Sequence, residues 1–289
     1  MSALKVLVTG GSGLLGQYLN LVLNESCSLV TLYNSEKRNC SQFNSRRLFL
    51  ENETDILNLL KEENPNIVIH AGAVSNPIIA DKIGNELTDK INVSATKIIS
   101  QFCSESNAKL VYISTDLVYD GNSGSYIDEN SKLNPISLYA ESKLEAEFAV
   151  QKYSNNYLIL RMALMFGKGL NGSQNFFTYM MENLKDNKPV NLFTDQYRTP
   201  LELSESARMI KEVITKECSN QIINFGGRDR ISRYEMGQLI CKKYGFDKSL
   251  LIKTKMSEIK NYKAVYDVSM NTDRLKNLGI VSKAVNEVI

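Results

Sequence analysis

Two side chains in the segment YAESK (139–143) have the types and the spacing for proton transfer. On a helix, residues i and i+4 are neighbours on one face, so the phenol of Tyr139 meets the ammonium of Lys143. A phenol has a pKa of about 10 in water, and a nearby ammonium favours the phenolate and lowers that pKa. The pair is therefore a candidate acid–base couple, although ordinary helix surfaces carry the same spacing without any catalytic role.

A hydroxyl at a strand end lies upstream of this pair. The apolar run 110–114 (LVYIS) leads into Thr115 and Asp116, just past the carboxyl end of a predicted strand. Ligands of open α/β sheets bind at that end of the strands. We therefore expect Thr115 to donate a hydrogen bond to a substrate carbonyl oxygen beside the Tyr139 hydroxyl. Ser114 is the competing candidate, because the two hydroxyls differ only in the face of the strand end that they occupy.

A glycine turn follows the first apolar run of the chain, where Gly10, Gly13 and Gly16 form a GxxGxxG pattern. The first glycine permits a tight turn, the second lets a pyrophosphate approach the backbone, and the third lets helix and strand pack closely. Unpaired N–H groups at the start of the helix then face the anion. The pattern predicts a dinucleotide site, and a tight turn without a ligand is the alternative.

The end of the second predicted strand bears on which dinucleotide binds. An NAD site usually carries Asp or Glu there, to bond the ribose hydroxyls. This strand ends in Tyr33 and Asn34 without a carboxylate, and Lys37 and Arg38 follow closely. The two cations favour NADP, because they can meet a 2′-phosphate. Solvated loop charges without a ligand are the alternative explanation.

The elements that must position these residues alternate between strands and helices. Alternation of this kind, with continuously apolar strands, predicts an α/β fold with a Rossmann-type doubly wound parallel sheet and a smaller mixed α/β substrate-binding lobe formed by C-terminal insertions. We expect a dinucleotide-binding domain at 1–165, to which 200–225 returns, and a lobe made of 166–199 and 226–289. Predicted strands cover 4–8, 28–33, 47–50, 66–70, 110–114, 157–161 and 221–224, and predicted helices cover 14–24, 55–63, 86–105, 139–153, 174–185 and 204–216.

Composition narrows the class of protein. The 289 residues include 34 Lys and Arg against 32 Asp and Glu, and no block of like charge predicts a nucleic-acid or membrane surface. No apolar run approaches the roughly 20 residues of a membrane span. Five scattered cysteines and the lack of an export leader indicate reduced thiols and a cytoplasmic location. His70 is the single histidine, so mechanisms with two histidines are excluded, and we interpret it as a packed residue at a strand end.

Together these features resemble the extended short-chain dehydrogenase/reductases. Leu14 stands where the classical group has glycine. The segment 69–73 (IHAGA) is similar to the family's fourth-strand end, which borders the cofactor, and 161–167 (RMALMFG) is similar to its Arg-to-Tyr-Gly segment after the sixth strand. Within this group the chain resembles the dTDP-4-dehydrorhamnose reductase family most. The segments that carry this resemblance are 113–121 (ISTDLVYDG), Tyr126 with Glu129, 134–135 (NP), 175–176 (NF) and 195–200 (DQYRTP), in which Arg198, and Leu201 just beyond, depart from the family's glycine and threonine.

The resemblance implies a role for each matched residue. Tyr139 is the implied proton donor, Lys143 its activator and ribose ligand, and Thr115 the polariser of the carbonyl. Asn92 is implied to position Lys143 through water. The implied cofactor site, with NADPH preferred and NAD as the alternative, comprises Gly10, Ser12, Gly13, Leu14, Leu15, Gly16, Asn34, Lys37, Arg38, Ala71, Gly72, Ala73, Asn92, Tyr139 and Lys143. The implied substrate-binding residues are Ser75, Thr115, Asp116, Tyr119, Asn175, Gln196 and Arg198.

The implied activity is reduction of a nucleotide-activated 4-keto-6-deoxy sugar, in deoxysugar and cell-surface polysaccharide biosynthesis, by a monomer or homodimer. Dehydratases of the superfamily carry Asp-Glu after the catalytic threonine, whereas Asp116-Leu117 follows Thr115 here, which disfavours elimination. No metal constellation is visible, which leaves open magnesium bound by carboxylates at a subunit contact. Two alternatives stay open: a nucleotide-sugar epimerase, and a non-catalytic, cofactor-binding regulatory subunit such as that of methionine adenosyltransferase.

Overall fold

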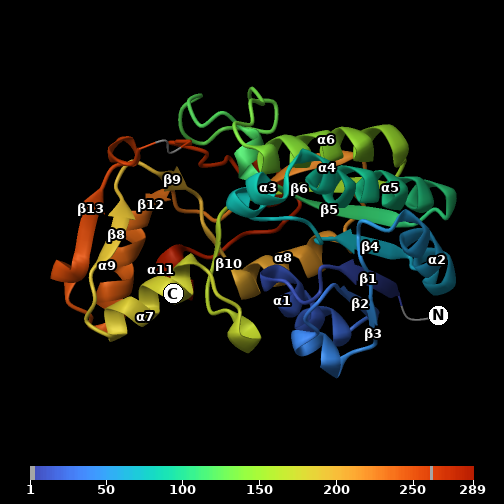
Figure 1. The fold of residues 1–289 in the computed structure, drawn as a ribbon, viewed down its shortest axis with the longest axis horizontal. Coiled ribbons are helices and arrows are strands. Elements are labelled where there is room, and N and C mark those ends of the chain that lie inside the picture. Colours follow the sequence, from blue (N-terminus) through green and yellow to red (C-terminus); the bar gives the residue numbers. More distant parts are fainter. Residues whose placement is uncertain (1–3, 261–262) are drawn as a thin grey trace.

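The computed structural model describes residues 4–260 and 263–289, and a seven-stranded parallel sheet forms its larger part (Figure 1). The strand order β11-β6-β5-β4-β1-β2-β3 reverses direction at β1 and β4, as in a doubly wound sheet. The Rossmann-type prediction is confirmed. The strands are β1 (Lys5–Thr9), β2 (Ser28–Tyr33), β3 (Ser45–Arg47), β4 (Ile67–His70), β5 (Lys109–Thr115), β6 (Tyr157–Met162) and β11 (Gln221–Phe225).

Helices bury both faces of this sheet. Helices α1 (Leu14–Asn24) and α8 (Leu203–Val213) pack on one face. Helices α2 (Glu53–Glu63), α5 (Ala95–Glu105) and α6 (Leu138–Tyr153) pack on the other. Each face has its own apolar core, which explains why the strands are apolar throughout rather than in alternation.

Two predicted elements differ from those in the structure. The predicted strand 47–50 is wrong: β3 ends at Arg47, because the chain leaves the sheet there towards α2, which Asn52 caps. The predicted helix 86–105 is interrupted. It consists of α4 (Asn85–Asp89), a π-helical turn (Lys90–Ser94) and α5, and α3 (Pro77–Ile83) precedes it. A π turn inserts one residue into a helix and is common at functional sites.

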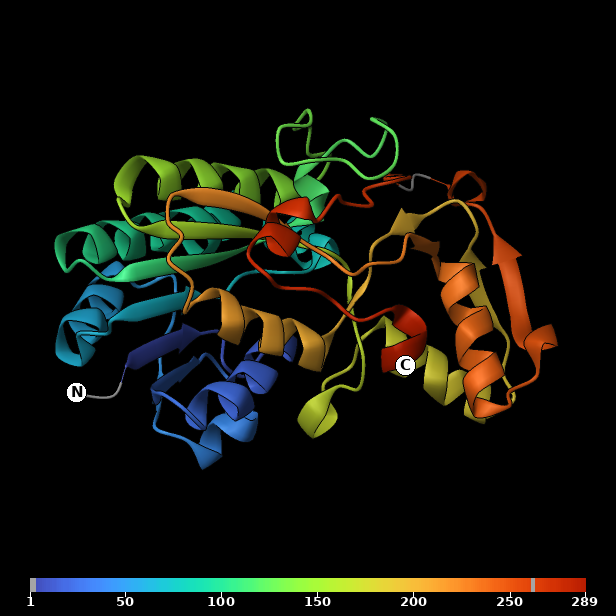
Figure 2. The same cartoon turned by 180° about the vertical axis from the view of Figure 1, so that it is seen from behind.

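A smaller lobe stands beside the carboxyl ends of the strands (Figure 2). Its core includes Phe166, Met180, Leu192 and Ile240, which come from separate elements. The elements that build it or lead into it are β7 (Met165–Phe166), α7 (Phe176–Lys185), β8 (Val190–Phe193), β9 (Tyr197–Arg198), β10 (Leu201–Glu202), β12 (Ile231–Ser232), α9 (Arg233–Tyr244), β13 (Leu251–Thr254) and α11 (Val285–Val288).

Short 3-10 helices connect many of these elements, at Arg38–Gln42, Asp116–Val118, Leu170–Gly172, Lys248–Leu250 and Met256–Glu258. The predicted domain boundaries stay a prediction. One segment of the predicted lobe range packs against the large sheet. Helix α10 (Asp273–Asn277) lies within the predicted lobe range, yet Leu275 and Ile280 pack into the core of the large sheet.

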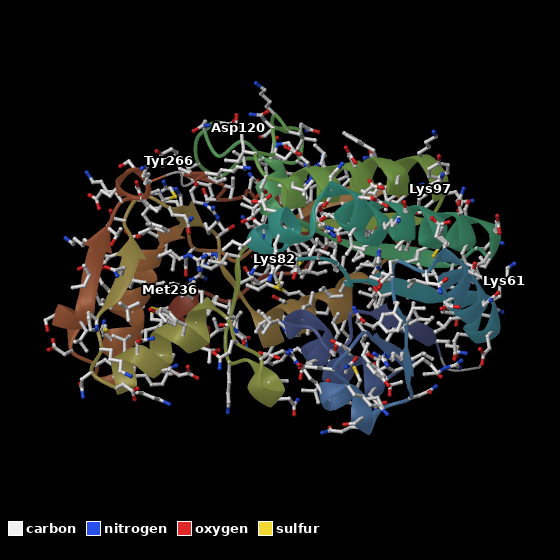
Figure 3. All side chains as sticks on the ribbon, viewed as in Figure 1. Lys61, Lys82, Lys97, Asp120, Met236 and Tyr266 are labelled. Atoms are coloured by element: carbon white, nitrogen blue, oxygen red, sulfur yellow. The ribbon has the colours of Figure 1, made fainter. Side chains whose placement is uncertain are left out.

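The loop after β5 joins the two parts. Figure 3 shows Asp120 and Tyr266 on the same side of the molecule, far from Lys97. The Asp267 amide donates to the Gly121 carbonyl at 3.0 Å, which fixes the loop to the lobe. Within the described residues, none of the helices combines the length and the apolar character needed to cross a membrane.

Candidate active site

Three predicted side chains meet where β5 ends against α6. Thr115 is the last residue of β5, and Tyr139 and Lys143 lie one turn apart on α6. All three are less than a tenth exposed, and the Thr115 side chain lies close enough to the Tyr139 hydroxyl to lower its pKa, against the effect of burial. Ser114, the competing candidate, donates instead to Glu147 Oε1 at 2.5 Å. The geometry therefore favours Thr115 as the hydroxyl that faces a substrate.

The sequence predicts that Lys143 lowers the pKa of Tyr139, whereas burial has the opposite effect on that phenol. Burial raises the pKa of Tyr139 to about 12, against the influence of the Thr115 side chain, which lowers it. Burial also lowers the pKa of Lys143 to about 7, opposed by the charge of Glu147. The Lys143 Nζ lies 4.0 Å from the centre of the Tyr112 ring. Tyr139 thus stays a protonated phenol, the state that an acid needs, while Lys143 exchanges its proton near neutrality.

The start of α6, the helix that carries Tyr139 and Lys143, is fixed by local bonds. The Ser137 side chain accepts from the Ala140 amide and caps α6, two residues before Tyr139. Asn92, in the π turn, donates to Ser142 Oγ at 2.9 Å and exchanges two bonds with the backbone of Val74. Asn92 therefore braces the helix between Tyr139 and Lys143, and its predicted action on Lys143 through water stays a prediction.

The glycine turn has the shape of a phosphate cradle. Gly10 has a φ of +69°, and a Cβ there would come within 2.7 Å of the Gly72 backbone. A Cβ on Gly16 would lie 2.1 Å from the Gly10 carbonyl oxygen. Gly13 caps α1 without a side-chain bond, and no acidic residue stands in the first turn. The first-turn amides around Leu14 and Leu15 therefore suit the pyrophosphate of a dinucleotide.

Lys37 and Arg38, predicted to meet a 2′-phosphate, follow β2. The Lys37 ammonium lies 5.8 Å from the Tyr33 ring centre, near Asn34, whose carbonyl accepts from Arg47. Arg38 Nη1 donates to the Ser12 carbonyl at 3.2 Å and also to Ser173 Oγ. The predicted contact of Lys37 and Arg38 with a 2′-phosphate stays a prediction.

Sequence reasoning did not predict two contacts of Arg38. Glu36 pairs with the Arg38 Nε at 3.1 Å, and Ser173 reaches it from beyond β7. The first is visible in the sequence as a nearby carboxylate, whereas the second depends on a contact between residues 135 positions apart.

The end of β4 borders the same cradle. Ala71 and Gly72 follow the strand directly, and the Gly72 amide donates to Thr9 Oγ1 at 3.0 Å. Ala73 continues this segment, and Ser75, a predicted substrate residue, is exposed at its end. The predicted roles of Ala71, Gly72 and Ala73 at the cofactor and of Ser75 at the substrate stay predictions.

Asp116 and Arg198 form a buried ion pair next to Thr115, at the end of β5. The Arg198 Nε lies 3.6 Å from Asp116 Oδ2, and both side chains are less than a tenth exposed. Burial raises the pKa of Asp116, and the charge of Arg198 opposes that rise. Arg198 also donates to the backbone carbonyls of Tyr197 and Val265. The arginine at this departure from the family pattern thus ties the lobe to the end of β5.

The remaining predicted substrate residues form hydrogen bonds with other parts of the protein. The Tyr119 side chain is 1% exposed, and its hydroxyl donates to Asn224 and accepts from Arg161. Its predicted substrate contact finds no support, because these structural bonds occupy the hydroxyl. Asn175 caps α7 through the Thr178 amide, and Gln196 accepts from Arg233 at 3.0 Å.

Sequence reasoning also did not predict a buried ion pair between α6 and β6. Glu147 lies one turn beyond Lys143, and Arg161 Nη2 donates to its Oε2 at 2.7 Å. Both side chains are at most 1% exposed. The signal was available in the sequence, because Glu147 continues the i, i+4 series that starts at Tyr139. Elsewhere in the described part of the chain, no group of three or more His, Cys, Asp or Glu residues is arranged to hold a metal ion.

Fold and site together define an extended short-chain dehydrogenase/reductase. The chain belongs to the family described as "RmlD substrate binding domain", whose model matches residues 4–282. It is similar to methionine adenosyltransferase 2 subunit beta of Bos taurus, with 24% identity over 283 residues, which cover 96% of this chain and 83% of that protein. It is also similar to the probable low-salt glycan biosynthesis reductase Agl14 of Haloferax volcanii, with 26% identity over 257 residues, 87% of this chain and 84% of that protein.

Solved structures show the same fold. The crystal structure of dTDP-4-dehydrorhamnose reductase from Bacillus anthracis in complex with NADP superposes with a TM-score of 0.82. That alignment covers 99% of this chain and 97% of the other, at 22% identity. At this identity the likeness establishes the fold, and the chemistry has to be argued from the residues of this chain.

Proposed function

We propose that this protein is an NADPH-dependent reductase of a nucleotide-activated 4-keto-6-deoxy sugar. The observation that carries the proposal is the convergence of Thr115, Tyr139 and Lys143 at the carboxyl edge of the sheet that also holds the glycine turn. The family match and the NADP complex of the structural neighbour support it. We further propose a cytoplasmic monomer or homodimer; all five cysteines are free, in keeping with a reducing compartment.

Each side chain has a defined part in this reaction. The hydroxyls of Thr115 and Tyr139 hydrogen-bond the substrate carbonyl oxygen and polarise it. NADPH, when bound, supplies the hydride to the carbonyl carbon. As the carbonyl becomes an alkoxide, the Tyr139 phenol gives its proton to that oxygen. The Lys143 ammonium then favours the phenolate that is left and replaces its proton.

The lobe completes the site in this proposal. Asp116 accepts a hydrogen bond from a sugar hydroxyl next to the ketone, and the charge of Arg198 opposes the rise in the pKa of that carboxyl that burial causes. Asn175 and Gln196, which belong to the lobe, contact the sugar in the proposed complex. Lys37 and Arg38 bind the 2′-phosphate and give NADPH its advantage over NADH.

The test is a panel of nucleotide-linked 4-keto sugars, headed by the dTDP-4-dehydro-6-deoxy sugar, assayed by loss of reduced-nicotinamide absorbance. We expect turnover that is faster with NADPH than with NADH. Failure of every sugar to oxidise either cofactor contradicts the proposal. Isomerised sugar with catalytic cofactor and no net oxidation identifies an epimerase instead.

A second candidate is a cofactor-binding regulatory subunit. The similarity to methionine adenosyltransferase 2 subunit beta over 96% of this chain favours it. The intact Thr115, Tyr139 and Lys143 argue against it, because a subunit that only binds cofactor has no need of a proton donor. Stable capture of a methionine adenosyltransferase catalytic subunit by this protein, with no reductase activity, supports the second candidate.

A further inference from the structure

A row of buried polar side chains starts at the glycine turn. Thr9 immediately precedes Gly10, and its Oγ1 lies 2.6 Å from His70 Nδ1. The other ring nitrogen, Nε2, lies 3.0 Å from Thr96 Oγ1. Thr96 in turn donates to the Asn92 carbonyl at 2.6 Å. Each of these side chains is at most 2% exposed, so the bonds are made without competition from bulk water.

The donors and acceptors of this row admit one arrangement that satisfies every group. A carbonyl only accepts, so the Thr96 hydroxyl spends its proton on Asn92 and must accept from His70. His70 therefore carries its proton on Nε2, and its Nδ1 accepts from Thr9. The Thr9 oxygen accepts the Gly72 amide at 3.0 Å. Burial, with the nearby charge of Lys143, lowers the pKa of His70 to about 3, which agrees with the neutral ring.

The row continues to α6, the proposed catalytic helix. The Asn92 side chain donates to Ser142 Oγ at 2.9 Å, and the Ser142 hydroxyl donates to the Tyr139 carbonyl at 2.8 Å. A line of hydrogen bonds thus runs from the residue before Gly10 to the backbone of Tyr139. It joins β1, β4, the π turn with the start of α5, and α6.

We propose that His70 is a positioning residue, which holds the glycine turn and the catalytic helix in fixed relation through Thr9 on one side and Thr96 on the other. The proposal rests on the proposed reductase function for its kinetic consequence, and on the hydrogen bonds alone for its structural one. Small displacements matter because a shift of about 1 Å in a reacting group can cost about 100-fold in rate.

The first test needs no substrate. His70 is the single histidine, so ¹⁵N-labelled protein gives one imidazole spin system that needs no assignment. We expect the neutral ring with the proton on Nε2, unchanged from about pH 5 to about pH 9. A proton on Nδ1, or titration near the ordinary histidine pKa, overturns the proposal. Because it does not involve turnover, this result stands even if no sugar is reduced.

The second test separates the two ends of the row. Thr96→Val removes the bond towards Asn92, and we expect kcat to fall about tenfold or more with little change in the dissociation constant of NADPH, which is measured from nicotinamide fluorescence. Thr9→Val removes the bond at the cradle, and we expect the dissociation constant to rise several-fold. Thr96→Ser and Thr9→Ser keep the hydroxyls and restore both values.

The matched control is Ser100→Ala. Ser100 is buried on the same helix and donates to the Thr96 carbonyl, outside the row. We expect its kcat and cofactor affinity to equal those of the unmodified protein. Unchanged kcat and affinity in both valine variants, or equal losses in the valine and serine variants, overturn the proposal. If a valine variant does not fold, the histidine spectrum of the unmodified protein decides.

Discussion

The two sides of the proposed cleft are built differently. On the sheet side, Thr115, Tyr139 and Lys143 come from one strand end and one helix face. A hydrogen bond from Asn92 to Ser142 braces that helix. On the lobe side, Asn175 and Arg198 sit on a helix cap and a two-residue strand. Both bond backbone groups of the lobe, and Arg198 also pairs with Asp116 at the end of β5.

In the proposed function, the sheet side carries out the chemistry and the lobe side recognises the sugar. The groups that move protons in the proposed mechanism sit on long elements buried in the core, where a displacement requires the core to move. The groups proposed to meet a sugar sit on short elements whose conformation depends on their neighbours. We therefore expect substitutions on the sheet side to abolish turnover or folding, and substitutions on the lobe side to change affinity or stability more modestly.

The largest effect is expected for Tyr139→Phe. Loss of the phenolic proton should lower kcat by about 10³-fold, within the range that general acid catalysis contributes, while NADPH still binds. Steady-state kinetics and nicotinamide fluorescence measure the two quantities. Tyr153→Phe, on the same helix and distant from Thr115, should leave both unchanged. Retention of most activity in Tyr139→Phe would remove the phenol from the mechanism.

The ion pair behind the catalytic helix should dominate stability. Glu147→Ala leaves the Arg161 guanidinium buried without its carboxylate, and we expect a loss of about 3–5 kcal/mol in the free energy of unfolding. Urea denaturation measures the loss. Asp186→Ala, which breaks an exposed pair with Lys188 in the lobe, is the control, and we expect no measurable change. Equal losses in the free energy of unfolding in the two variants would contradict the expected difference between the two regions.

The pH dependence of reduction tests the charge of Lys143. Its pKa is lowered to about 7, so the ammonium is complete below that pH and is lost above it. Since Tyr139, with a pKa of about 12, stays protonated, kcat should be flat on the acid side and fall above about pH 7. Lys143→Arg, which keeps its charge, should remove the alkaline fall from whatever activity remains. A profile that rises through neutrality contradicts this assignment.

The smallest effect belongs to the lobe. Asn175→Ala removes the cap of α7 and should lower the free energy of unfolding by about 1 kcal/mol, measured by urea denaturation. Asn175→Asp keeps an acceptor for the Thr178 amide and should recover most of the loss. A loss of activity far larger than this loss of stability would show that Asn175 does more than cap its helix.

The contrast also explains what the sequence alone can predict. The glycine turn and the Tyr139–Lys143 pair are local patterns, in which spacing along the chain determines spacing in the fold. The α/β class and the doubly wound parallel sheet follow from the alternation of apolar strands with helices.

Other features depend on contacts that no local pattern carries. Thr9 and His70 are 61 residues apart, and Asn92 and Ser142 are 50 apart, so their row of bonds appears only once the sheet is assembled. Tyr119 matched a family segment, yet its hydroxyl bonds Asn224, 105 residues away. The rise in the Tyr139 pKa could not be predicted either, because burial outweighs a neighbouring charge only when the depth of the site is known.

The most direct test of the central claim is a crystal structure of the protein with NADPH. We predict that the pyrophosphate lies against Gly10 and Gly13, and that the nicotinamide stands beside the Tyr139 hydroxyl with Lys143 on the attached ribose. A dinucleotide bound elsewhere, or a nicotinamide that these side chains do not approach, would contradict the account.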